Sequence, residues 1–162
     1  MRIESYVLAA ALLAMVPTTS FAQGQPRPQS NGPAKLEDVL LAACIQGAKY
    51  SSDNPRQVDY VTGKAQATTH GIVNNPRFKD VISVVATMKV GDARRNVRCD
   101  FGRATPKDPI DFLAAQWDGR TYVGEPNQAL RPRMKEPDDV KREDRFLGAV
   151  YEMMRNASGN VR

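Results

Sequence analysis

Hydrophobic and polar residues alternate through residues 81–101, on both sides of Gly91-Asp92. Two alternating runs joined by such a two-residue turn predict a β-hairpin. With the turn at Gly91-Asp92, one face collects apolar residues and Cys99, and Arg95 is its only charged member. The pairs expected on this inward face are Val90–Ala93, Met88–Arg95, Ala86–Val97, Val84–Cys99 and Ile82–Phe101. A slip by one residue would mix the two faces, so the pattern and the turn specify the same register.

The other face of this hairpin is polar and basic. Its expected pairs are Lys89–Arg94, Thr87–Asn96, Val85–Arg98 and Ser83–Asp100. The whole chain has a formal net charge of +5, which favours anionic partners through long-range attraction. Lys89, Arg94 and Arg98 are therefore the predicted anion-binding residues. The alternative is a solvated basic face that only keeps the protein in solution.

Two further segments have strand patterns. The first covers residues 57–69, where Val61, Gly63, Ala65 and Ala67 share one face. These inward residues are mostly small, which would let a helix approach closely. Residues 74–76 (Asn-Asn-Pro) form the turn signal before the central hairpin. Residues 111–125 contain Asp118-Gly119, a favoured hairpin turn, which would pair Trp117 with Arg120, Ala115 with Tyr122 and Ala114 with Val123. A short helix over residues 112–117 is the alternative.

Helical spacing of apolar residues appears near both ends of the chain. Residues 34–50 predict an amphipathic helix that carries Cys44 on or near its buried side and stops at residues 51–55. Residues 126–137 carry three prolines and predict an extended loop. Asp138 or Asp139 would then cap a helix through residue 158. Its stripe of Phe146, Ala149, Val150 and Met153 is widened by Leu147, Tyr151 and Met154, which would pack on the sheet or form a partner face.

The N-terminal segment has the pattern of a signal peptide. Arg2 precedes an apolar run over residues 6–16 that is too short to span a bilayer, and Ser20-Phe21-Ala22 predicts cleavage after Ala22. An uncleaved anchor is the alternative. Residues 23–33, rich in Pro, Gly, Gln and Ser, predict a disordered tether. We therefore expect export to a periplasm and no transmembrane segment in the mature chain.

Cys44 and Cys99 are the only cysteines. In an oxidising compartment they predict a disulfide that joins the first helix to the central hairpin. A redox or nucleophilic cysteine would need a lowered pKa and a neighbouring base, and no CxxC motif is present.

Catalytic motifs are absent from the sequence. His70 is the only histidine, and no HExxH, P-loop or GxGxxG occurs, so no metal and no cofactor is expected.

Together these patterns predict an α+β fold: an N-terminal helix packed on an antiparallel sheet of four to five strands, with a C-terminal helix. A signal peptide (1–22) and a tether (23–33) precede one domain (34–156), and a frayed tail (157–162) follows it. The leading hypothesis is a non-enzymatic periplasmic binding or accessory protein that engages a protein partner or an envelope component. The alternatives are a module that binds anionic lipid or polysaccharide, and a small hydrolase that uses His70 or a carboxylate pair. No nucleic-acid partner is expected, and the pattern leaves the oligomeric state open.

Overall fold

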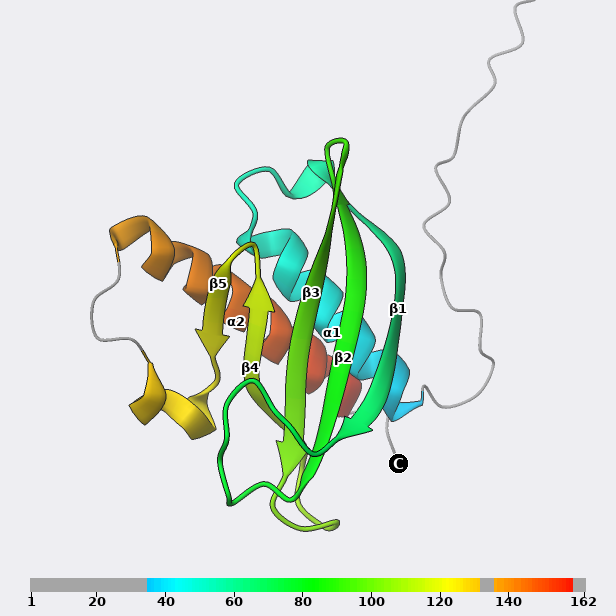
Figure 1. The fold of residues 1–162 in the computed structure, drawn as a ribbon, viewed down its shortest axis with the longest axis vertical. Helices are drawn as coiled ribbons and strands as arrows, with labels where there is room; N and C mark the ends of the chain where they lie inside the picture. The colour runs from blue at the N-terminus through cyan, green and yellow to red at the C-terminus, as the bar shows by residue number, and fades with distance from the viewer. Residues whose placement is uncertain (1–34, 132–135, 159–162) are drawn as a thin grey trace, which may run out of the picture.

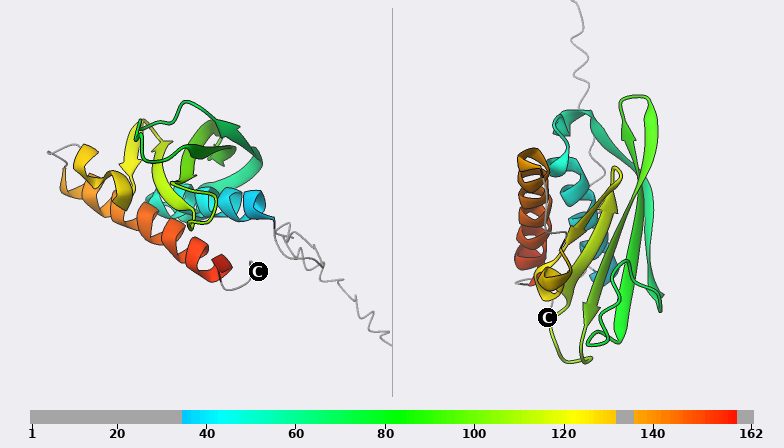
Figure 2. Two further views of the ribbon diagram at one scale, coloured as in Figure 1. Left: turned by 90° about the horizontal axis from the view of Figure 1, so that it is seen from below. Right: turned by 60° about the vertical axis from the view of Figure 1, so that its left-hand side comes forward.

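The computed structural model describes residues 35–131 and 136–158. These form one five-stranded antiparallel sheet in the order β1-β2-β3-β4-β5, and both long helices cover the same face of it (Figure 1, Figure 2). The α+β prediction is thus confirmed. The elements are α1 (Leu36–Ser51), η1 (Pro55–Gln57), β1 (Val58–Thr68), β2 (Asp80–Val90), β3 (Ala93–Arg103), β4 (Asp111–Trp117), β5 (Arg120–Val123), η2 (Glu125–Leu130) and α2 (Pro137–Ser158).

The central hairpin of β2 and β3 has the predicted register. Val90 pairs with Ala93, and the ladder continues without interruption to the pair of Asp80 and Arg103. Val84, Ala86 and Met88 point into the core and are fully buried, because the alternation places every second residue of β2 under the helices. Gly91 has a φ of 59°, a conformation that the tight turn requires and that glycine adopts without strain.

Strand β1 follows its predicted alternation only in its second half. Gly63, Ala65 and Ala67 lie opposite inward-facing residues of β2, as expected. Val61, however, is the extra residue of a β-bulge, because Tyr60 pairs with Met88 and Thr62 pairs with the next residue of β2. The prediction that Val61 faces the core was therefore wrong, and its side chain is 42% exposed.

The second hairpin is also confirmed. Strands β4 and β5 pair Trp117 with Arg120 and Ala115 with Tyr122 around Asp118-Gly119, which excludes the alternative of a helix over residues 112–117. Both turn residues have positive φ, 51° for Asp118 and 73° for Gly119, as a type I′ turn needs.

α1 ends at Ser51, within the stop predicted over residues 51–55. α2 differs from its prediction at its start. α2 begins at Pro137, so Asp138 and Asp139 lie in its first turn, where acidic residues favour the helix dipole, instead of capping it. The predicted loop over residues 126–137 instead starts within a 3₁₀ helix, η2. α2 extends to Ser158, beyond residue 156, where the prediction ended the domain.

The core lies between the sheet and the two helices. The helices approach closely at Gly47, where an added Cβ would lie 2.8 Å from Val150 Cγ2 and 2.9 Å from Phe146 Cζ. Phe146 of α2 stacks on Tyr122 of β5 with ring centroids 4.4 Å apart.

Cys44 and Cys99 form the predicted disulfide across this core. Both residues are fully buried, and their Cα atoms are 5.9 Å apart. The bond joins α1 to the central strand β3 over a sequence separation of 55 residues.

No helix within the described ranges combines the length and the apolar character needed to cross a membrane. The expected signal peptide and tether lie outside the described residues, as do residues 159–162.

Candidate functional site

The face of the sheet opposite the helices carries the predicted basic residues. Lys89 and Arg94 are directly paired across β2 and β3, next to the turn, and both are exposed. β4 first pairs with β3 at Arg98, so this end of the hairpin projects beyond the second hairpin, as Figure 1 shows. Neither Lys89 nor Arg94 forms an ion pair with any of the described side chains.

Placing two cations opposite each other in a sheet is unfavourable by itself. Like charges at directly paired positions destabilise a hairpin by a few tenths of a kcal/mol to about 1 kcal/mol. Asp59 pairs with Lys89 from the β1 side and offsets part of this repulsion. On the Arg94 side no strand is paired at this level, and the adjacent outward pair, Thr87 and Asn96, is uncharged and hydrogen-bonded at 2.9 Å. The turn residue Asp92 is a second nearby carboxylate, two positions from Arg94 in the chain. The hairpin end therefore presents two exposed cations that have no ion-pair partner among the described side chains.

Arg98, the third predicted anion-binding residue, is held in a different arrangement. Its guanidinium donates to Asp100 Oδ1 at 3.1 Å, to the Ser83 hydroxyl at 2.9 Å and to the His70 carbonyl at 2.6 Å. The side chain is 35% exposed, whereas the Asp100 carboxylate beside it is 2% exposed. Arg98 thus carries a compensated charge, and the structure groups only Lys89 and Arg94 as unpaired cations at the hairpin end.

A loop segment buries part of the outward face of the sheet around Asp100, the partner of Arg98. The segment over residues 69–79 crosses this face of the sheet (Figure 1), and the Ile72 N–H donates to Asp100 Oδ2 at 2.5 Å. Ser83 and Asp100 consequently lie under the segment, although the alternation predicted them on an open surface. The predicted turn in this segment is present, with the Phe78 N–H donating to the Asn75 carbonyl at 3.0 Å.

His70 lies at the start of the same segment. Its ring Nδ1 is 2.9 Å from the Thr69 hydroxyl, the one hydrogen-bond partner of the ring among the described residues. The side chain is exposed on a loop. Within residues 35–131 and 136–158, no three His, Cys, Asp or Glu side chains gather closely enough to hold a metal ion.

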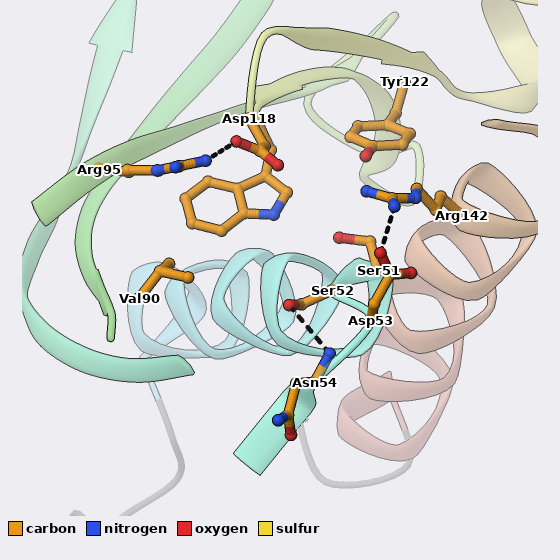
Figure 3. Close-up of a pocket in the computed structure, with 10 residues that line it drawn as sticks. Ser51, Ser52, Asp53, Asn54, Val90, Arg95, Asp118, Tyr122 and Arg142 are labelled. Atoms are coloured by element: carbon orange, nitrogen blue, oxygen red, sulfur yellow. Dashed lines mark hydrogen bonds and ion pairs between the residues drawn. The ribbon is translucent and has the colours of Figure 1, made fainter. Parts of the chain in front are cut away.

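A pocket of about 210 Å³ lies on the helix side, where the end of α1 meets the β4–β5 turn and α2. Figure 3 shows Arg95 and Asp118 directed toward each other on one side of it and Arg142 and Asp53 on another, each pair joined by an ion pair.

The Arg142–Asp53 pair belongs to a network that stabilises the end of α1. Arg145 also reaches Asp53, at 3.3 Å, and donates to the Ser51 carbonyl, so cations collect where the helix dipole is negative. On the hairpin side, Arg120 donates to Asp139 at 2.7 Å. Burial raises the pKa of the Tyr122 hydroxyl, which lines the pocket together with Ser51. The charges around the pocket are therefore compensated within the protein.

The possible partner face on α2 lies largely against the chain's own domain. Leu147 is 8% exposed and belongs to the core cluster, and Tyr151 and Met154 pack against that cluster. The Tyr151 hydroxyl accepts a hydrogen bond from the Glu125 N–H at 2.9 Å, and burial raises its pKa. The helix packs mainly on α1, with smaller contacts to the edge of the sheet.

Comparison of the chain with protein-family models, with curated proteins and with solved structures found no match.

Proposed function

We propose that this protein is an exported binding protein that recognises an anionic component of the cell envelope through the end of its central hairpin. In this proposal the chain is cleaved after Ala22 and acts in the periplasm by binding and not by catalysis. The binding residues are Lys89 and Arg94, and the recognised group is a phosphate or carboxylate carried by a lipid or a polysaccharide.

The observation that supports the proposal is the Lys89–Arg94 pair, in which neither cation has an ion-pair partner among the described side chains. Most arginines of the described residues have a carboxylate partner, as in the Arg98–Asp100 and Arg120–Asp139 pairs. At the hairpin end, two exposed cations instead lie across one strand spacing, about 5 Å. One phosphate or carboxylate can contact both, which replaces a repulsion with two charge-assisted hydrogen bonds.

The buried disulfide supports the proposed location. Cys44 and Cys99 are joined in the centre of the core, and such bonds persist in oxidising compartments such as the periplasm. Mass spectrometry of protein recovered from the periplasm tests this part, and the expected N-terminal residue is Gln23. Recovery of the chain with residues 1–22 attached would contradict it.

The binding proposal is tested by charge reversal. Binding to anionic phospholipid vesicles and binding to an anionic envelope polysaccharide are measured in separate assays, which shows whether the recognised group belongs to a lipid or to a polysaccharide. The variant K89E/R94E should lose whichever binding the wild type has. The matched control K79E/K107E makes the same change in net charge, and its two exposed sites lie near the opposite end of the sheet. Equal binding by the two variants would contradict the proposal, and so would unchanged binding by K89E/R94E. Vesicles of zwitterionic lipid should bind none of the proteins.

A further inference from the structure

Strand β1 leaves a long edge of the sheet open. It is 11 residues long and pairs only with β2 among the described residues, and Figure 1 shows it at the right-hand border of the sheet. Such an edge presents unpaired N–H and C=O groups that can accept another strand. Two large apolar side chains are exposed on it, Tyr60 at 40% and Val61 at 42%.

The bulge determines which residues of β1 share a face. Because Val61 is the extra residue, Asp59, Thr62 and Lys64 all point to the outer face, where they lie opposite Lys89, Thr87 and Val85 of β2. Tyr60 and Gly63 point to the inner face, opposite Met88 and Ala86. Without the bulge, Asp59 and Lys64 would lie on opposite faces, since they are an odd number of residues apart.

This sequence of faces is complementary to itself in the antiparallel direction. Place Thr62 on a two-fold axis, opposite Thr62 of a second copy. Because the bulge residue Val61 takes no place in the pairing of either copy, Asp59 then lies opposite Lys64, and Lys64 lies opposite Asp59. On the inner face, Tyr60 lies opposite Gly63 in both directions. Opposite charges, threonine pairs and an aromatic residue across from glycine are all favourable cross-strand neighbours.

We propose that β1 is a dimerisation edge: two copies of the chain pair through their β1 strands around Thr62 and form one continuous ten-stranded sheet. The occupant is a second copy because the strand supplies both members of each charge pair, as a two-fold interface requires. A lysine and a bulge on an edge also oppose unspecific pairing, and here the same two features select one register. The Lys89 and Arg94 side chains of both copies would lie on the same face of this sheet.

Charge reversal and exchange test the register. K64D and D59K should each weaken the dimer of the mature protein by about tenfold in sedimentation experiments, because two attractive pairs become two repulsive ones. The double variant D59K/K64D should restore the dimer, since the pairs are exchanged and not removed. K107D, at an exposed loop site outside β1, is the matched control and should dimerise like the wild type.

Crosslinking gives a second test that does not depend on the stability of the charge variants. T62C should form an intermolecular disulfide under mild oxidation, because paired antiparallel positions have Cα separations of about 5 Å. Q66C, on the same face of the same strand, should not, since its copies would lie about 27 Å apart. A monomeric wild type at about 100 µM, a double variant that stays dissociated, or equal crosslinking at both positions would each overturn the proposal. If another segment of the same chain covered β1, the wild type would be monomeric in this experiment.

Discussion

Replacing Asp100 by asparagine should loosen the attachment of the segment over residues 69–79 to the sheet at Ile72. The carboxylate is 2% exposed and accepts on both oxygens, from the Ile72 N–H on Oδ2 and from the Arg98 guanidinium on Oδ1. An asparagine side chain has one acceptor oxygen and one NH₂ group. In the variant, at least one of the two donors must therefore face another donor.

The size of the effect follows from these contacts. A hydrogen bond to a charged group contributes about 1.5–3 kcal/mol, and a buried donor without a partner costs about 1–3 kcal/mol more. Because Arg98 is 35% exposed and retains Ser83 and the His70 carbonyl, part of this cost is recovered by water. We expect D100N to lower the free energy of unfolding by about 3 kcal/mol.

The assay is urea denaturation combined with hydrogen exchange of the Ile72 amide. The matched control is D80N, since Asp80 is 51% exposed and its ion pair with Arg103 spans 3.5 Å. Exposed pairs contribute little, so D80N should change the stability by less than about 1 kcal/mol. Equal unfolding midpoints for D100N and D80N, with unchanged exchange at Ile72, would refute the assigned role of Asp100.

Three further predictions concern the core. Replacing both Cys44 and Cys99 by alanine should lower the free energy of unfolding by about 4 kcal/mol, from the 55-residue separation that the disulfide spans, and an unfolding midpoint equal to that of the oxidised wild type would contradict this. G47A should destabilise the protein by about 1–3 kcal/mol because its Cβ would overlap Val150 and Phe146, whereas G148A, which has open space on α2, should stabilise it by up to about 1 kcal/mol; thermal denaturation that ranks them in reverse would contradict the packing. Burial raises the pKa of Tyr122, so the unfolded chain releases this proton first, and the free energy of unfolding should fall as the pH rises above about 10; Y122F should reduce this fall, and an unchanged pH profile would contradict it.

The central hairpin could be predicted in full because two independent signals agree. The Gly91-Asp92 turn and the alternation of residues 82–101 specify one register, and a slip would expose a hydrophobic face. The disulfide can be predicted from the same register. This register places Cys99 on the inward face, and the predicted first helix carries Cys44 on or near its buried side. Asp118-Gly119 predicted the second hairpin in the same way, through a turn that needs two residues with positive φ.

The missed features depend on contacts between distant segments. Nothing in the alternation of β1 distinguishes Val61 as a bulge, because the bulge is defined by its pairing with β2. Ser83 and Asp100 occupy outward positions, and their burial results from a loop more than 20 residues away from Asp100 in the chain. The alternation groups Arg98 with Lys89 and Arg94 because all three share the outward face. Its bond to Asp100 is local, but the loop that covers this pair and accepts from Arg98 at the His70 carbonyl has no local signal.

The measurement that tests the central claim most directly is a map of backbone amide shifts in the nuclear magnetic resonance spectrum of ¹⁵N-labelled protein that comprises residues 23–162. The protein would be titrated with anionic lipid headgroup or envelope polysaccharide. We expect the largest shifts in the hairpin over residues 87–96, with α1 and α2 unaffected. Shifts centred on the helices, or on the pocket beside Asp53 and Arg142, would contradict the claim that Lys89 and Arg94 at the end of the hairpin form the binding site.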